Sequence, residues 1–183
     1  LSLHLTFAFI TFAYTLWVAL DLIYPNRTEV IISLRNLARI TLVLLLVQII
    51  YGGFVAGLNA GLIHNHWPMM SDGQFIHDSV FIEQQTLFLN LVEGKSGVQF
   101  VHRTMAYFVV GLIALLYFRS KKYTLNLQQQ KGLNFLVLIV LLQFTLGVFT
   151  LLLHVPLWLG LLHQIVAFFL LTAMTYTLHR LSK

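Results

Sequence analysis

Apolar residues run through five stretches of the chain, each long enough to cross a bilayer, which takes about 20 helical residues. They fall near 1–23, 37–58, 98–118, 132–154 and 157–178. Only Val155 and Pro156 separate the last two stretches. Because proline breaks one helix and suits the first turn of the next, we expect a tight hairpin there. The pattern predicts an all-α polytopic membrane bundle with five transmembrane helices.

The connection over 59–97 is much longer than the others. It spans 39 residues and carries five large apolar side chains, those of Trp67, Phe75, Phe81, Phe88 and Leu91. Loops of this length between neighbouring helices are often functional. It is too apolar for a solvated linker, so we expect part of it to lie on the membrane surface or over the mouth of a cavity.

The composition excludes a soluble domain. Of 183 residues, 58% are hydrophobic and only 9% are charged, and the mean hydropathy is +0.84, whereas soluble domains carry about 25% charged residues. The absence of cysteine excludes a disulfide framework, a zinc finger and a cysteine nucleophile. The net charge of +5 would suggest nucleic acid in a soluble protein, but these basic residues lie in short loops between apolar runs. That placement indicates membrane topology and no nucleic-acid partner.

The basic residues also predict an orientation. With five spans, nine of the 11 Lys and Arg lie on one side: Arg27, Arg35, Arg39, Arg119, Lys121, Lys122, Lys131, Arg180 and Lys183. Positive loops stay inside, so we expect the C-terminus in the cytoplasm or matrix and the loop 59–97 on the periplasmic or intermembrane side. Four or six spans would scatter these charges over both faces.

Two motifs recur along the chain. His-x-x-x-Ala-aromatic opens the first, third and fifth stretches, at His4, His102 and His163. Gln-x-x-x-Gly-x-Phe occurs in the second and fourth, at Gln48 and Gln143. The spacing from His to Gln is 44 residues in one copy and 41 in the other. The repeating unit is therefore a two-helix hairpin, present twice and begun a third time.

The repeat places all three histidines at a similar depth, within about two turns of the outer end of their spans. An ionisable group inside a membrane is a functional hypothesis by default. Two imidazoles on different helices would suit haem iron as a six-coordinate site. The alternatives are a neutral imidazole hydrogen-bonded to a neighbouring helix, zinc, which usually needs a third or fourth ligand, and copper.

Other polar residues near the spans allow two interpretations each. Arg103 would either pair with a haem propionate or extend to lipid headgroups. His64 and His66 are expected at the surface rather than at a site mouth. Gln48 and Gln143 are expected to form interhelical hydrogen bonds, and His179 is expected at the interface.

Several motifs together resemble the haem A synthase family over essentially the whole chain. They are Gly53-Phe-Val-Ala-Gly-Leu-Asn-Ala-Gly61, Trp67-Pro-Met69, Val98-Gln-Phe-Val-His-Arg103 with Ala106-Tyr107, Leu146-Gly-Val, His154-Val-Pro156 and Leu162-His-Gln164. The chain is similar to the cysteine-free branch. It differs in having Asn59 where Asp is expected, and His64 and His66 where Tyr and Thr are more common, which puts the polar contacts of the outer loop in doubt.

The resemblance implies the C-terminal five helices of an eight-helix oxidoreductase built from two pseudo-symmetric four-helix halves. Residues 1–23 would then be the last helix of the substrate-haem half, and 24–183 the half that binds haem b. By this resemblance His102 and His163 are the axial ligands of haem b iron, Arg103 contacts the cofactor, and His4 is a ligand of the substrate haem. The family's second-helix glutamate has no counterpart in this sequence, and no catalytic residue is assigned.

The implied reaction is oxidation of the C8 methyl group of haem O to a formyl group, giving haem A for cytochrome oxidase assembly. The implied partners are haem O, membrane lipid, haem O synthase, an electron donor and further copies of the chain. Because three helices of the family's pattern are missing, we expect the chain alone to bind haem b without making haem A. The alternatives from other classes are a membrane b-type cytochrome subunit that transfers electrons, and a transporter with a proton-relay histidine.

Overall fold

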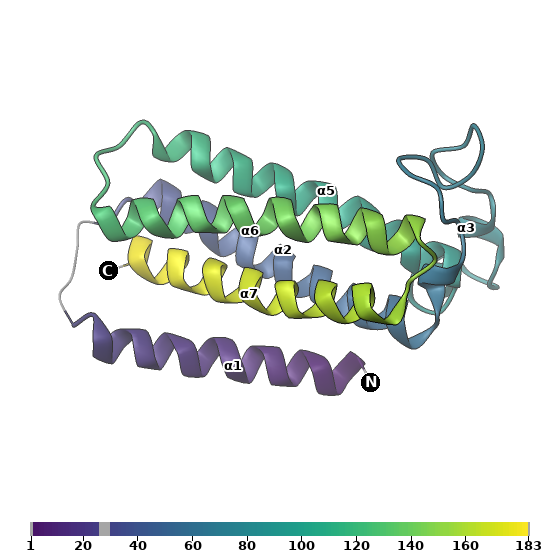
Figure 1. Ribbon diagram of the computed structural model, residues 1–183, viewed down its shortest axis with the longest axis horizontal. Helices are drawn as coiled ribbons and strands as arrows, with labels where there is room; N and C mark the ends of the chain where they lie inside the picture. The colour runs from purple at the N-terminus through teal and green to yellow at the C-terminus, as the bar shows by residue number, and fades with distance from the viewer. Residues whose placement is uncertain (1, 26–29, 183) are drawn as a thin grey trace.

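The computed structural model describes residues 2–25 and 30–182. Five long helices lie side by side and the described residues include no named strand (Figure 1). The helices are α1 (Ser2–Ile23), α2 (Ile32–Gly57), α5 (Lys95–Ser120), α6 (Leu127–Leu152) and α7 (Leu157–Ser182). All five are long and apolar enough to span a membrane, which confirms the predicted bundle. Arg27 and Lys183 lie outside the described residues.

Four of these helices form a closed ring. α2 packs on α5, α5 on α6, α6 on α7, and α7 on α2, so α5 and α7 stand at opposite corners. α1 packs outside the ring against α7 and α2. The core between the helices is aliphatic, with Leu116, Leu136 and Leu171 fully buried. The outer faces are apolar too: Leu138 is 62% exposed and Leu157 is 89% exposed, as expected for side chains that meet lipid tails.

Several helices extend beyond the apolar stretches that predicted them. α6 begins at Leu127 rather than near 132, because Asn126 and Gln129 form a capping box that satisfies free backbone N–H groups at its start. α5 begins at Lys95 rather than 98, because the carboxylate of Glu83 accepts hydrogen bonds from the N–H groups of Lys95 and Ser96 (both 2.9 Å). Polar side chains that cap the helices set these boundaries, and a hydropathy pattern does not reveal such caps.

The hairpin between α6 and α7 is as tight as predicted. His154 and Val155 both adopt positive φ values, 61° and 55°, a conformation that a β-branched valine rarely takes. The Val155 N–H donates to the carbonyl of Thr150 (2.8 Å). α7 then begins directly after Pro156.

The long outer connection forms a compact cap on α5. It contains the 3-10 helix η1 (Ala60–Leu62) and the short helices α3 (Ser79–Ile82) and α4 (Leu87–Val92). Figure 1 shows α3 beyond the end of the bundle. α4 approaches α5 so closely that a Cβ on Gly97 would overlap the carbonyl oxygen of Asn90. Only glycine permits this contact. The connection therefore rests on the helix that carries His102.

Candidate functional site

The first candidate histidine, His102 on α5, packs into a notch on α2. The amide nitrogen of Gln48 lies 3.5 Å from His102 Nε2 and donates to the His102 backbone carbonyl at 3.0 Å. One turn further along α2, a Cβ on Gly52 would lie 3.2 Å from His102 Cε1. Gln48 thus contacts the imidazole nitrogen of His102, and Gly52, which has no side chain, leaves the space that the imidazole ring fills.

The second candidate histidine, His163 on α7, packs into a matching notch on α6. Here the amide nitrogen of Gln143 lies 3.2 Å from His163 Nε2. A Cβ on Gly147 would lie 3.0 Å from His163 Cε1. The Gln-x-x-x-Gly motif and the His motif, which the sequence showed as two separate repeats, are therefore the two halves of one contact. We call each unit a histidine socket: Gln48–Gly52–His102 and Gln143–Gly147–His163.

The two sockets belong to opposite corners of the helix ring. Each ring buries an Nδ1 atom that has no hydrogen-bond partner among the described residues, and the side-chain oxygens of Gln48 and Gln143 are buried without partners as well. Buried polar groups normally find partners. Four unmatched atoms around two imidazoles therefore mark a place where a further group belongs.

The donor chemistry fits haem iron better than a bare metal ion. Imidazole nitrogens are common axial ligands of haem. No group of three or more His, Cys, Asp or Glu side chains among the described residues could hold a metal ion, and structural zinc usually needs four ligands. The interhelical hydrogen bonds expected of Gln48 and Gln143 are confirmed.

Arg103, next to His102, ties α5 to the outer connection. Its guanidinium donates to the carbonyls of His64 (3.2 Å), His66 (2.9 Å), Pro68 (3.1 Å) and Met69 (2.9 Å). One arginine thus closes four backbone carbonyls over the outer end of the His102 socket. The side chain is therefore engaged with backbone carbonyls of the outer connection.

A polar cluster lies inside the outer cap, and sequence analysis missed it. His64 Nε2 lies 3.0 Å from Ser96 Oγ and 3.3 Å from Ser79 Oγ, and its ring lies 4.5 Å from that of His77, between centroids. Burial, with His77 and Arg103 nearby, lowers the pKa of His64 below its ordinary value. His64 is therefore half-buried in a polar cluster that the surface expectation did not include, whereas His66 is exposed as expected.

Glu83, whose carboxylate caps the start of α5, belongs to the same polar cluster. Burial alone would raise the pKa of Glu83, but hydrogen bonds from the backbone N–H groups of Ser96 and Lys95 outweigh it and lower the pKa. Its negative charge also lies at the positive end of the helix dipole. Both effects favour the ionised carboxylate in the folded protein.

The remaining histidines stand apart from the sockets. His4 lies on α1 with an exposed side chain, so the structure brings it together with neither His102 nor His163. His179, expected at the interface, is fully buried, and its Nε2 lies 2.7 Å from Asp21 Oδ1 on α1. Asp21 is 158 residues away in sequence, and no local pattern could have indicated the pair.

The fold and the paired sockets define an integral membrane helix bundle with histidines packed between its helices. The chain belongs to the COX15-CtaA family of cytochrome oxidase assembly proteins, whose family model matches residues 1–175. This agrees with the resemblance seen in the sequence.

The curated relatives are similar over the full length of the chain. It is 74% identical to "Heme A synthase" of Flavobacterium johnsoniae and 70% identical to that of Flavobacterium psychrophilum, covering 100% of this chain and 54% of each relative. It is 40% identical to "Heme A synthase" of Wolbachia pipientis wMel, covering 51% of that protein. The chain therefore spans about half the length of the relatives it matches. No solved structure matches it.

Proposed function

We propose that this chain is the haem b-binding part of a haem A synthase. The whole enzyme would oxidise the C8 methyl group of haem O to a formyl group, giving haem A for cytochrome oxidase. Family membership and the printed function of the relatives support this activity. In this proposal residues 24–183 form the haem b half, and residues 1–23 form the last helix of the substrate half.

The observation that carries the proposal is the pair of matched sockets. His102 and His163 extend from opposite corners of the ring, and each is held by a glutamine and a glycine of the neighbouring helix. We assign these imidazoles as the axial ligands of haem b, which when bound supplies one-electron iron chemistry. In this proposal the glutamine and glycine of each socket orient the ring toward the iron.

Two protein ligands would fill both axial positions, so we assign this half to electron transfer or structure. Oxidation of the methyl group would then belong to the other half of the enzyme. There His4, exposed on the first helix, is our candidate for a ligand of the substrate haem. For Arg103 we propose a role at the cofactor's edge, as the partner of a propionate, next to the carbonyls that it already binds.

The charge pattern supports an orientation. Arg35 lies near the start of α2, Arg119 near the end of α5 and Lys131 near the start of α6. These helix ends lie at the end of the bundle opposite the outer connection (Figure 1). Positive loops stay inside, so we place the C-terminus in the cytoplasm or matrix and the connection in the periplasm or intermembrane space. Haem O, haem O synthase, an electron donor and membrane lipid are the partners that we propose.

Absorption spectroscopy of the purified chain tests the haem assignment. The chain reconstituted with haem b should give the spectrum of low-spin, six-coordinate iron with two histidine ligands. The His102→Ala and His163→Ala variants should each lose that spectrum and bind haem more weakly by over about 100-fold, since even an outer-shell partner is worth 10–100-fold. The matched control is His154→Ala, at the exposed outer hairpin. Full haem binding by both socket variants would refute the assignment.

A non-enzymatic b-type cytochrome would pass the spectral test, because it also uses two histidines. Extraction of haem from cells separates the two functions. Cells that carry the complete gene should contain haem A, and cells without it should accumulate haem O. The isolated 183-residue chain should bind haem b and yield no haem A. Unchanged haem A content in cells lacking the gene would favour the electron-transfer alternative.

A further inference from the structure

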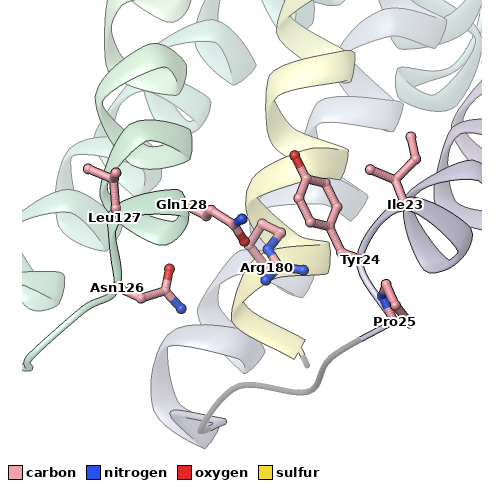
Figure 2. A pocket seen from close by; sticks show the side chains of 7 residues that line it. All are labelled: Ile23, Tyr24, Pro25, Asn126, Leu127, Gln128 and Arg180. Atoms are coloured by element: carbon pink, nitrogen blue, oxygen red, sulfur yellow. The ribbon is translucent and has the colours of Figure 1, made fainter.

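A pocket of about 440 Å³ opens at the basic end of the bundle (Figure 2), and no socket residue lines it. It lies where α1 ends, α6 begins and α7 ends. Seven residues line it: Ile23, Tyr24, Pro25, Asn126, Leu127, Gln128 and Arg180. Figure 2 shows the guanidinium of Arg180 at its centre, with Tyr24 on one side and Gln128 on the other.

The charge of Arg180 is buried, and no described residue supplies its counter-ion. The residue is only 2% exposed, and its Nε and Nη1 atoms have no hydrogen-bond partner among the described residues. No carboxylate of the described chain lies within ion-pair distance of it. The acidic residue on the neighbouring helix, Asp21, is bound by His179 instead.

Arg180 makes two contacts that hold it in place, but neither accepts a hydrogen bond from its guanidinium Nε or Nη1. The guanidinium carbon lies 4.5 Å from the centroid of the Tyr24 ring, in a cation–π contact. The backbone carbonyl of Arg180 accepts a hydrogen bond from the Gln129 side chain (3.0 Å), which fixes the last turn of α7. Because a buried charge without a partner is costly, this guanidinium favours the binding of an anion.

We propose that Arg180 binds a phosphate group in this pocket. The planar guanidinium fork matches the oxygens of a phosphate. Further cations near the helix ends at this end of the bundle attract anions to it: Arg35, Arg119, Lys121 and Lys131. The last turn of a membrane-spanning helix lies at the depth of lipid headgroups, where such phosphates are concentrated. The phosphate comes either from a lipid headgroup or from free phosphate.

Titration in a phosphate-free maltoside detergent separates these sources. The 183-residue chain would be titrated with dioctanoyl phosphatidylglycerol, with dioctanoylglycerol, which lacks the phosphate, and with inorganic phosphate. Native mass spectrometry counts bound lipid, and thermal unfolding reports stabilisation. We expect one phosphatidylglycerol to bind and raise the unfolding temperature, and dioctanoylglycerol to do neither. Equal stabilisation by inorganic phosphate would identify free phosphate as the ligand and uphold the site.

Two variants test the role of Arg180. Arg180→Gln should weaken binding of the phosphate probe by about tenfold or more, as expected for loss of a charge-assisted interaction. Gln128→Glu should do the same while keeping the arginine paired and the helix packing intact, because it adds an internal carboxylate beside the guanidinium. Lys122→Gln, an exposed residue at the same end, is the matched control and should bind as the parent chain does.

Two results would overturn the proposal. Either the parent chain, Gln128→Glu and Lys122→Gln bind the phosphate probe equally well, or none of the three binds it. Haem b titration on the same samples keeps this result separate from the proposed function. The pocket variants leave both sockets untouched, so their haem affinity should match that of the parent chain.

Discussion

The two histidine sockets are alike in the membrane and different at their outer ends. Gln48–Gly52–His102 and Gln143–Gly147–His163 place a donor and a glycine against an imidazole in the same way. Above His102, however, α5 carries the whole outer connection, which Arg103 and Gln99 hold by its backbone carbonyls. Above His163 lies the four-residue hairpin between α6 and α7, which the connection only borders: Asn65 donates to the Leu151 carbonyl (2.9 Å), and Gly61 lies against Val155. A duplicated unit has thus kept its internal contacts while its outer ends diverged.

The glutamines differ as well. Gln48 donates to the His102 carbonyl and reaches the ring nitrogen only at 3.5 Å, whereas Gln143 lies 3.2 Å from the ring nitrogen of His163. Gln48 therefore contributes to the packing of α2 on α5, and Gln143 acts mainly on the ring. The glycine contact is also closer in the second socket, at 3.0 Å against 3.2 Å. These differences predict unequal responses to equivalent substitutions.

The largest expected difference comes from adding a methyl group at the glycines. Gly147→Ala should weaken haem b binding by about 1–3 kcal/mol, because the new Cβ forces the His163 ring to move. Gly52→Ala should lower the haem affinity less, because a Cβ there would lie further from its imidazole ring, at 3.2 Å from His102 Cε1. Haem titration of the purified variants measures both. Gly111→Ala on α5 is the matched control, because nothing lies within 4 Å of a Cβ there. Equal losses in all three variants would show that the close contacts do not matter.

Removing the amides should have a smaller effect and should separate ring orientation from helix packing. Gln143→Leu should lower haem affinity by about tenfold and shift the reduction potential, as loss of an outer-shell partner does. Gln48→Leu should mainly lower the unfolding temperature, since an interhelical hydrogen bond in a membrane protein is worth about 0.6 kcal/mol. Gln164→Leu, exposed on α7, is the control. If both socket variants changed the reduction potential equally, the distinction between the sockets would fail.

The smallest expected effect is a pH dependence confined to the outer cap. Because the folded protein lowers the pKa of His64, the unfolded chain binds the proton more tightly, and stability falls as the pH drops below about 6.5. Glu83 also has a lowered pKa, so its contribution is lost at still lower pH, below about 4.3. Protease sensitivity of the connection should therefore rise on acidification, while the α6–α7 hairpin stays intact.

Variants assign that pH effect. His64→Gln should remove the step near pH 6.5, and Glu83→Gln should weaken the cap at every pH above about 5, because the uncharged side chain binds the N–H groups of α5 less strongly. His66→Gln, whose side chain is exposed, should behave like the parent chain. An acid transition that persisted in His64→Gln would have to come from another group.

Prediction from sequence worked best for features that depend only on residues close together in the chain. The five spans follow from the length and hydropathy of single segments, and the His and Gln motifs are visible as repeats at a spacing of 44 and 41 residues. Helix boundaries were predicted less well, because Glu83 caps α5 from 12 residues away. The outer polar cluster was missed for the same reason: His64 meets Ser96 across 32 residues of chain.

The sequence by itself determined that this protein is a five-span bundle with basic residues gathered at one end and histidines repeated at one depth, because hydropathy, charge and spacing are properties of short segments. Only the tertiary structure decided which glutamine meets which histidine, that Arg103 closes over the outer connection, and that His179 and Arg180 are buried. Such contacts join helices that are distant in sequence, and their partners are set by how the helices pack around one another.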